Sequence, residues 1–154
     1  MTTIEGNLTP PSSRVAIVAA KFNRDVVDRL VDGALDGLRK HGVSEMAIDL
    51  LRVPGSFELP LTCQWLAATG RYAAVIALGA VVRGDTDHYD YVCHAATQGL
   101  VQANLNTGVP VVFGVLTCDT EEQALARAGG AEGNKGFDAA LAALEMANLF
   151  TQIQ

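Results

Sequence analysis

The sequence predicts a three-layer α/β fold, in which a four-stranded parallel sheet is covered by helices on both faces. Four short apolar runs alternate along the chain with segments whose apolar residues recur at helical spacing. Each run is apolar throughout, which is typical of a strand buried on both faces. Strands that alternate with helices imply right-handed crossovers, and therefore parallel strands.

The first strand is predicted at residues 14–20, RVAIVAA, and the helix after it at residues 24–40. Asn23 is a suitable N-cap for this helix, because its side chain can accept a hydrogen bond from a free backbone N–H group. His41 lies in a basic last turn, where a cation offsets the helix dipole, so we interpret it as structural and not as a ligand. Gly42 suits the position just after the helix.

The second strand is predicted at residues 47–53, AIDLLRV, and the turn Pro54-Gly55-Ser56 follows it. We expect Ser56 to cap a helix over residues 57–69. Pro60 is tolerated there because it falls near the first helical turn. The third strand is predicted at residues 73–82.

The turn at residues 83–88, RGDTDH, separates the third strand from a helix predicted at residues 88–107. A turn at the carboxyl end of a parallel strand often carries a ligand site, because the next helix offers unpaired N–H groups. One face of the helix is made of small and aliphatic residues, so we expect another helix to approach it closely. This face consists of Val92, Ala95, Ala96, Gly99, Leu100 and Ala103.

The fourth strand is predicted at residues 111–117, VVFGVLT. Thr120 and Gln123 then fit a capping box at the start of a short helix. Three glycines between residues 129 and 133 end that helix, and a final helix is predicted at residues 135–152.

Residues 1–13 are expected to form an N-terminal arm, and residues 14–154 a single domain, which suits a chain of 154 residues. The arm contains Pro10 and Pro11 and has no clear hydrophobic period. Its residues 3–8 are able to pair as an edge strand.

Composition argues against several classes of function. The formal net charge is −6, whereas a nucleic-acid surface needs a basic stripe. No apolar run approaches the ~18 residues of a membrane span, and no signal peptide is visible. The three cysteines are widely spaced within apolar patterns, so we interpret them as buried thiols and not as a disulfide framework. We therefore expect a cytoplasmic protein with no nucleic-acid or membrane partner.

The basic residues are unevenly distributed along the chain. Only Arg127 and Lys135 follow Arg83, and they lie in a segment rich in Asp and Glu. Two interpretations stay open for this pair. They are solvated surface charges, or they bind an anionic ligand.

The four strand ends should meet at one edge of the sheet, and polar or aromatic residues follow each strand. Phe22 has the shape to stack on a flat heterocycle, although an aromatic at the rim of a core is the commoner case. Glu58 falls in a first helical turn, where an acid needs no ligand. His88 also falls in a first turn, where the dipole disfavours its cation, so we expect a neutral imidazole that can accept a proton. A histidine held by local hydrogen bonds is the alternative.

Thr86 and the N–H groups after Gly84 have the arrangement of a phosphate nest, provided that the carboxylates of Asp85 and Asp87 point away. A metal site is not expected, because His88 is five and six residues from Cys93 and His94 and does not share a helix face with them. The chain also has no P-loop, no dinucleotide-binding glycine motif and no nucleophile elbow.

Taken together, six segments resemble the lumazine synthase family. They are AKFN, VPGSFELP, ALGAVVRGDTDHYDYV, GVPVVFGVLT, EEQALARAG and GNKGFDAALAALEMANL. The resemblance covers essentially the whole chain, including IEGNL of the arm. It implies a flavodoxin-like fold and a transferase that needs no cofactor and no metal. The implied reaction, the penultimate step of riboflavin biosynthesis, condenses 5-amino-6-(D-ribitylamino)uracil with 3,4-dihydroxy-2-butanone 4-phosphate to 6,7-dimethyl-8-ribityllumazine, releasing phosphate and water.

The resemblance also implies roles for individual residues. Phe22 would stack on the pyrimidine ring, and His88 would relay protons during imine formation, phosphate elimination and ring closure. The substrate-binding residues would be Phe22, Asn23, Ser56, Phe57, Glu58, Val81, Val82 and Phe113, of which residues 56–58 hold the ribityl chain. The phosphate-binding residues would be Gly84, Asp85, Thr86, Arg127 and Lys135.

In the family the pocket lies between subunits, so Phe113, Arg127 and Lys135 are expected to come from the neighbouring chain. The implied unit is a homopentamer, in which the arm adds an edge strand to the adjacent subunit and the small-residue face of the helix at residues 88–107 lines the fivefold axis. The short loop before GNKG favours an icosahedral assembly of pentamers, and riboflavin synthase is a candidate partner.

Two rival functions agree less well with the sequence. A non-catalytic flavin-binding or cage protein would be expected to lack His88, Arg127 or Lys135, and all three are present. A riboflavin synthase of the archaeal type would convert two lumazines, but agreement along the whole chain favours the first enzyme. One departure concerns Asp87, where the family more often has Pro or Thr, and it puts the phosphate affinity and the helix cap in question.

Overall fold

The computed structural model describes residues 1–154, in which strands and helices alternate. The strands are β1 (Arg14–Ala20), β2 (Ile48–Val53), β3 (Tyr72–Val82) and β4 (Val111–Cys118). The helices are α1 (Arg24–Lys40), α2 (Leu59–Ala68), α3 (His88–Thr107), α4 (Glu121–Ala126) and α5 (Lys135–Ile153). A small antiparallel hairpin of β5 (Ala128–Gly130) and β6 (Gly133–Asn134), which the sequence did not predict, connects α4 to α5. None of the helices carries a stretch long and apolar enough to cross a membrane.

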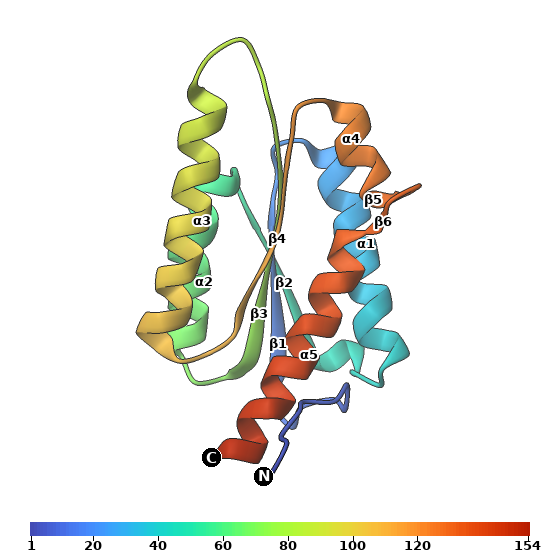
Figure 1. The fold of residues 1–154 in the computed structure, drawn as a ribbon, viewed down its shortest axis with the longest axis vertical. Helices are drawn as coiled ribbons and strands as arrows, with labels where there is room; N and C mark the ends of the chain where they lie inside the picture. The colour runs from blue at the N-terminus through green and yellow to red at the C-terminus, as the bar shows by residue number, and fades with distance from the viewer.

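The molecule has three layers, with the sheet in the middle (Figure 1). The strand order is β2-β1-β3-β4, and each neighbouring pair is parallel. Helices α2 and α3 cover one face of the sheet, and α1, α4 and α5 lie on the other (Figure 1). The predicted three-layer α/β class with a four-stranded parallel sheet is confirmed.

Two hydrophobic cores lie on the two faces of the sheet, and the side chains of β1 and β3 alternate between them. Ile17 and Ile76 point into the core shared with α1 and α5, where Leu30 is fully buried. Val18 and Val75 point into the core shared with α2 and α3. Burying one such side chain contributes about 1.5–3 kcal/mol. This double burial explains why the strands are apolar along their whole length.

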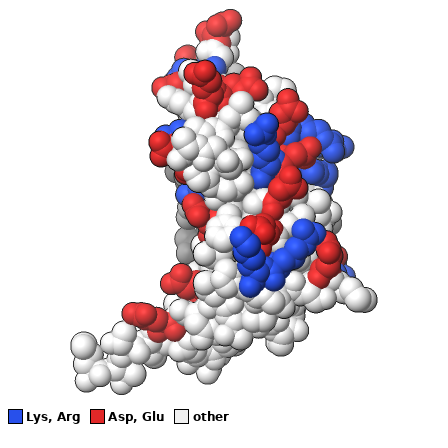
Figure 2. Space-filling model, turned by 90° about the vertical axis from the view of Figure 1, so that its right-hand side faces the viewer, with Lys and Arg blue, Asp and Glu red and all other residues white.

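Ion pairs cover the outer surface of α1. Arg24 pairs with Asp28 at 3.3 Å, and Asp28 also pairs with Arg52 of β2 at 2.8 Å. Lys40 pairs with Asp36 at 3.1 Å. Figure 2, which views the side of the molecule where α1 and α4 lie, shows acidic and basic side chains next to one another over this surface. The cations of α1 are therefore largely neutralised by their neighbours.

The caps predicted for α1 and α2 are wrong. Asn23 has a left-handed backbone, with φ 57° and ψ 48°, and its side chain caps nothing. This conformation leaves its Nδ2 to donate to the carbonyl of Ala80 at 2.7 Å, so tertiary structure takes the side chain away from the helix. Ser56 begins a 3₁₀ turn, Ser56–Glu58, and α2 starts only at Leu59.

The small-residue face of α3 packs against α2, as predicted. A Cβ atom at Gly99 would lie 2.5 Å from the Cβ of Pro60, so glycine is required where the two helices meet. Ala96 on the same face is fully buried inside the chain. The implied role of this face at a fivefold axis is therefore wrong. The surface of α3 that remains for a neighbour is the opposite one, where Tyr91 and Leu105 are exposed.

Residues 1–13 form no helix or strand in the chain and run beside the end of α5 (Figure 1). The backbone N–H of Asn7 donates to Oδ1 of Asn148 at 2.9 Å, and Nε2 of Gln152 donates to the carbonyl of Glu5 at 2.7 Å. The expected pairing of this arm with a neighbouring subunit stays a prediction.

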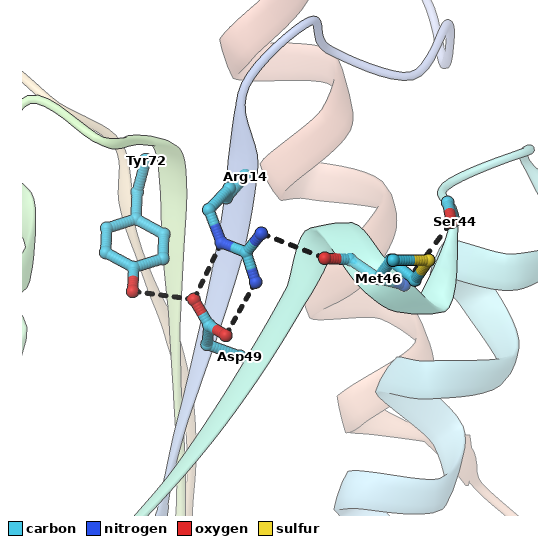
Figure 3. A network of polar contacts seen from close by, with 5 residues as sticks. All are labelled: Arg14, Ser44, Met46, Asp49 and Tyr72. Carbon is cyan, nitrogen blue, oxygen red and sulfur yellow. Dashed lines mark hydrogen bonds and ion pairs between the residues drawn. The ribbon is translucent and has the colours of Figure 1, made fainter.

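A polar network ties three strands together at the amino-terminal edge of the sheet (Figure 3). The guanidinium of Arg14 donates two hydrogen bonds to the carboxylate of Asp49, at 2.7 and 2.8 Å. The hydroxyl of Tyr72 donates to the same carboxylate at 2.8 Å. The hydrogen bond from Arg14, followed by that from Tyr72, lowers the pKa of Asp49 to about 2. The ionised carboxylate is thus the form that holds β1, β2 and β3 together.

Because the pKa of Asp49 is lower in the folded state than the ordinary value of 3.8, its contribution to stability is complete above about pH 4 and disappears as the pH falls through about 2. We expect Asp49→Asn to lower the free energy of unfolding at pH 7 by about 0.5–1 kcal/mol, since the pair is partly exposed. The difference from the parent should shrink toward pH 2. Urea denaturation across this pH range measures it, with Asp32→Asn, at an exposed aspartate that forms no ion pair, as the surface control. A difference that does not change with pH would contradict the assignment.

Candidate functional site

The predicted site residues gather around loops at the carboxyl edge of the sheet, which lies at the top of Figure 1. The loops after β1, β2 and β3 meet there, because parallel strands end at the same edge. A cavity of about 230 Å³ is lined by Phe22, Asn23, Ser56, Ala80, Val81, Val82, Gly84, Thr86, His88, Tyr89 and Val92. An adjoining cavity of about 520 Å³ shares four of these residues and adds Pro54, Gly55, Phe57 and Glu58. We call the two together the turn-side cavity.

Ser56, which lines both parts of the turn-side cavity, is in close contact with Gly79 of β3. Ser56 is the only buried polar residue of the chain. A Cβ atom at Gly79 would clash with its hydroxyl oxygen, so only glycine lets the serine lie against the strand. The hydrogen bond from Asn23 to Ala80 ties the end of β1 to the same strand. Part of the hydrogen-bonding capacity of Asn23 is thus used for structure.

Thr86 and His88 are connected by a hydrogen bond in the exposed turn before α3. Oγ1 of Thr86 accepts from the backbone N–H of His88 at 3.3 Å, which leaves the hydroxyl hydrogen of Thr86 free to donate. Asp87 occupies the N-cap position, but its side chain makes no capping hydrogen bond. The side chain of Asp85 lines neither part of the turn-side cavity.

Two aromatic rings stand at the mouth of the turn-side cavity. Phe22 is 71% exposed and Phe57 is 63% exposed in the single chain. Large aromatic side chains are usually covered, by protein or by a ligand, because their burial is strongly favourable. The rings offer flat apolar surfaces on which a planar heterocycle can stack.

A second cavity of about 540 Å³, which we call the cation-side cavity, opens beside β4, α4 and the start of α5. It is lined by Phe113, Val115, Leu116, Thr117, Cys118, Gln123, Arg127, Glu132, Lys135 and Asp138. It shares no lining residue with the turn-side cavity. Within one chain, therefore, Arg127 and Lys135 are not brought to His88.

The two cations of this cavity are not neutralised by ion pairs. Arg127 donates through Nη1 to the carbonyl of Gln123 at 3.0 Å, and neither Arg127 nor Lys135 forms an ion pair. Glu132 and Asp138 line the same cavity. Sequence reasoning missed these two acids, although Asp138 stands one helical turn after Lys135 and so faces the same side. They balance the positive charge of the cavity in the single chain.

Asn134 holds the segment that carries both cations. Its Oδ1 accepts from the N–H groups of Gly136 and Phe137 at 2.8 and 3.1 Å, which caps α5. Its Nδ2 donates to the carbonyl of Arg29 in α1 at 3.0 Å. The side chain lies against Gly33, where a Cβ atom would clash with it. Asn134 therefore fixes the start of α5 against α1.

Tyr89 is a cavity residue that the sequence did not single out. It directly follows His88 in the first turn of α3 and lines the turn-side cavity. Its ring lies under the guanidinium of Arg83, with 4.3 Å to the ring centroid. Burial raises the pKa of Tyr89, so its hydroxyl stays protonated near neutral pH. The sequence feature that could have identified Tyr89 as a site residue was its position next to His88.

The thiols are poor candidates for the chemistry of the site. Cys63, Cys93 and Cys118 are all unpaired, and Cys93 is only partly buried, contrary to expectation. Burial raises the pKa of each thiol, to about 12 for Cys63. A protonated thiol is a weak nucleophile. The structure also places no group of three or more His, Cys, Asp or Glu side chains where they could hold a metal ion.

Comparison with known proteins covers nearly the whole chain. Residues 12–151 match the model of a protein family described as 6,7-dimethyl-8-ribityllumazine synthase. A curated protein of that name from Halorhodospira halophila is 56% identical over 155 residues, which span 100% of this chain and 99% of the relative. Another, from Desulfovibrio desulfuricans, is 52% identical over 151 residues, which span 98% of this chain and 97% of the relative. The match to the family includes every residue that lines the two cavities.

We expect Asn134→Ala to lower the free energy of unfolding by about 2 kcal/mol, of which about 1 comes from the helix cap and about 1 from the hydrogen bond to Arg29. Asn134→Asp keeps the capping oxygen and should lose less. Urea denaturation at a fixed protein concentration measures both losses. Asn106→Ala removes an exposed asparagine of α3 and should stay within about 0.5 kcal/mol of the parent. Equal losses of unfolding free energy in Asn134→Ala and Asn106→Ala would show that the hydrogen bonds of the Asn134 side chain contribute nothing to stability.

Proposed function

The chain belongs to the 6,7-dimethyl-8-ribityllumazine synthase family, and we propose that its site is formed by the turn-side cavity of one subunit and the cation-side cavity of a neighbour. The enzyme is a transferase of riboflavin biosynthesis. It condenses 5-amino-6-(D-ribitylamino)uracil with 3,4-dihydroxy-2-butanone 4-phosphate to 6,7-dimethyl-8-ribityllumazine, and it releases phosphate and water. Its substrates are small molecules, and the family forms oligomers.

One observation supports a site shared between subunits: within one chain, the cations that could bind a phosphate lie in a different cavity from His88. The butanone phosphate brings a dianionic group, which needs cations or many N–H donors around it. No Lys or Arg lines the turn-side cavity, although His88 and the exposed aromatic rings lie there. The unpaired Arg127 and Lys135 line the other cavity. A neighbouring subunit that docks its cation-side cavity onto this mouth would supply the missing charge.

The pyrimidine substrate would lie in the turn-side cavity. Phe22 would stack on its ring, and the backbone groups near Val81 and Val82 would pair with the ring edge. Ser56 and Glu58 offer a hydroxyl and a carboxylate for the ribityl hydroxyls. The remaining residues proposed to bind this substrate are Asn23, Phe57 and, from the neighbour, Phe113. Rings on both sides of the mouth would exclude water from the amine that reacts.

The phosphate group would sit on the turn before α3. The free hydroxyl hydrogen of Thr86 and the backbone N–H groups after Gly84, including that of Asp85, are donors at this point. The neighbour's Arg127 and Lys135 would add charge-assisted hydrogen bonds, which are roughly twice as strong as neutral ones. The phosphate would therefore be held by both subunits.

His88 is proposed to move protons in three steps. The ring amine attacks the ketone carbon, and loss of water from the adduct gives an imine. Removal of a proton from the neighbouring carbon then expels phosphate and leaves an enol, which takes up a proton on carbon to become a ketone. The ribitylamino nitrogen attacks this ketone carbon, and loss of a second water closes the lumazine ring. Each step needs a proton taken up or released near the mouth of the cavity, where the imidazole of His88 is exposed beside Thr86. General acid–base catalysis of this kind contributes roughly 10²- to 10⁴-fold.

For the assembly we propose a closed ring of head-to-tail contacts, which gives every turn-side cavity one cation-side neighbour. The resemblance to the family sets the proposed size of the ring at five subunits, a homopentamer. The short segment between β5 and β6 supports a larger icosahedral assembly, and riboflavin synthase is the proposed partner. In this assembly residues 1–13 act as an arm and residues 14–154 as the domain. We place the enzyme in the cytoplasm, because three unpaired thiols suit a reducing compartment.

Mixing the two substrates and following lumazine absorbance and phosphate release tests the proposed roles. We expect Arg127→Ala to raise the KM for the butanone phosphate by roughly tenfold or more, because a hydrogen bond to a charged group is lost. His88→Ala should lower kcat by roughly 10²-fold with a smaller effect on that KM. Arg29→Ala, which removes a cation outside both cavities, should behave as the parent. An unchanged KM in Arg127→Ala, or an unchanged kcat in His88→Ala, would refute the corresponding role.

Co-expression of two variants tests whether the site is shared. Random co-assembly of His88→Ala and Arg127→Ala subunits in equal amounts would restore both native residues in about one quarter of the sites. We expect the co-expressed mixture to exceed the mean activity of the two variants, measured at low butanone phosphate. The same variants mixed after separate assembly are the control. If the co-expressed mixture only reached the mean, both residues would act within one chain.

A further inference from the structure

Arg83 joins the two ends of the turn before α3 to each other and to β4. Its Nε donates to Oδ1 of Asp119 at 2.9 Å, and its Nη1 lies 3.7 Å from Oδ1 of Asp90 in the first turn of α3. Its guanidinium covers the ring of Tyr89. Its backbone N–H donates to the carbonyl of Cys118 at 2.9 Å. One residue thus connects the end of β3, the start of α3 and the end of β4.

The turn itself has few other restraints. Residues 84–88 are all exposed, and the space where a Cβ atom of Gly84 would stand is open. The only side-chain hydrogen bond inside the turn is the one between Thr86 and the N–H of His88. The contacts of Arg83 are therefore the main connection that holds these residues at a fixed distance from the end of β4.

The contacts of Arg83 continue to the other cavity of the same chain. The backbone N–H of Asp119 donates to Oε1 of Gln123 at 2.9 Å. The carbonyl of Gln123 in turn accepts from Nη1 of Arg127 at 3.0 Å. A short series of hydrogen bonds thus runs from the turn with Thr86 to the cation of the cation-side cavity.

We propose that Arg83 and Asp119 form a positioning pair for the phosphate-binding part of the enzyme, holding Thr86 and the turn in place through Arg83 and the start of α4 through Asp119. This inference rests on the proposed placement of the phosphate on the turn. It concerns the binding of the butanone phosphate and of inorganic phosphate, and not that of the pyrimidine, for which the proposed contacts are Phe22, Ser56 and the backbone near Val81.

Two observations distinguish this positioning role from direct binding of phosphate by Arg83 and from a general contribution to stability. Arg83 lines neither cavity, and its charge faces the carboxylates of Asp90 and Asp119, so it does not itself offer a free cation to a phosphate. The side chains of the Arg83–Asp119 pair are also 48% and 64% exposed. Ion pairs at such exposure add little to global stability. Loss of the pair should therefore alter the turn and leave the fold intact.

The test measures phosphate binding by the assembled enzyme. The dissociation constant of inorganic phosphate is measured by calorimetry, and the KM of each substrate is measured in the condensation assay. The variants are Arg83→Ala, Arg83→Lys, Asp119→Asn and the combination of Arg83→Ala with Asp119→Asn. Arg71→Ala is a matched control, because Arg71 lies over the ring of Tyr72 at 5.7 Å, at the opposite edge of the sheet.

We expect Arg83→Ala to weaken phosphate binding and to raise the KM of the butanone phosphate by roughly tenfold, because displacements of about 1 Å at a binding group have effects of this order or larger. The KM of the pyrimidine should change by less than about twofold, and the melting temperature should stay close to that of the parent. Arg83→Lys should fall in between, since lysine keeps the charge but loses the planar fork and the stacking. Asp119→Asn should act in the same direction, and the combined variant should be no worse than Arg83→Ala.

Unchanged phosphate binding in Arg83→Ala would overturn the proposal. So would fully additive effects in the combined variant, or equal losses for both substrates together with a lower melting temperature, which would indicate general destabilisation. Thr86→Val and Arg127→Ala separate this inference from the proposed site. If they weaken phosphate binding and Arg83→Ala does not, only the positioning role fails. If neither of them has an effect, the proposed phosphate site fails as well.

Discussion

Burial of β3 on both faces is the constraint on which the site depends. The strand pairs with β1 on one side and β4 on the other, and its side chains enter both cores. A strand in this position must be apolar along its length, so polar chemistry begins only where it leaves the core, after Val82. Because its neighbours run parallel to it, their carboxyl ends arrive at the same edge. The turn with Thr86 and His88 therefore lies beside Phe22 and Ser56 as a result of packing, and not of its own sequence.

The side chains of the site are held by close contacts that leave no room for a Cβ atom. Ser56 can lie against β3 because residue 79 is glycine, and Asn134 can reach α1 because residue 33 is glycine. At Gly136 a Cβ atom would clash with the backbone carbonyl of Leu30. These glycines have no strained backbone and serve to bring elements together. Interiors are packed as densely as organic crystals, so such contacts leave a functional group little room to move.

Within one chain, the groups needed for an anionic substrate are divided between two cavities. The turn-side cavity has the exposed rings, the histidine and the hydroxyls, and the cation-side cavity has Arg127 and Lys135. In the proposed arrangement a single chain folds by itself, but two neighbouring chains are needed to form one catalytic site. This would account for the exposure of Phe22 and Phe57, since a ligand and a second subunit would both cover them. In a ring of subunits each chain would contribute its turn-side cavity to one site and its cation-side cavity to the neighbouring site. The contact between Arg83 and Asp119 would then connect these two sites within one chain.

The sequence by itself determined the order of the elements, most of their bounds and the edge of the sheet where the candidate residues lie. Those properties follow from hydrophobic periodicity and from the geometry of parallel strands, which are readable along the chain. Only the tertiary structure decided which partner each polar side chain takes. Asn23 and Ser56 were both suitable caps, but a carbonyl of β3 and Gly79 were the nearer neighbours. Arg83 and Asp119 are 36 residues apart and meet only because β3 and β4 pair. The residue type decides which hydrogen bonds a side chain is able to make. The groups that the fold brings within reach decide which of those bonds forms.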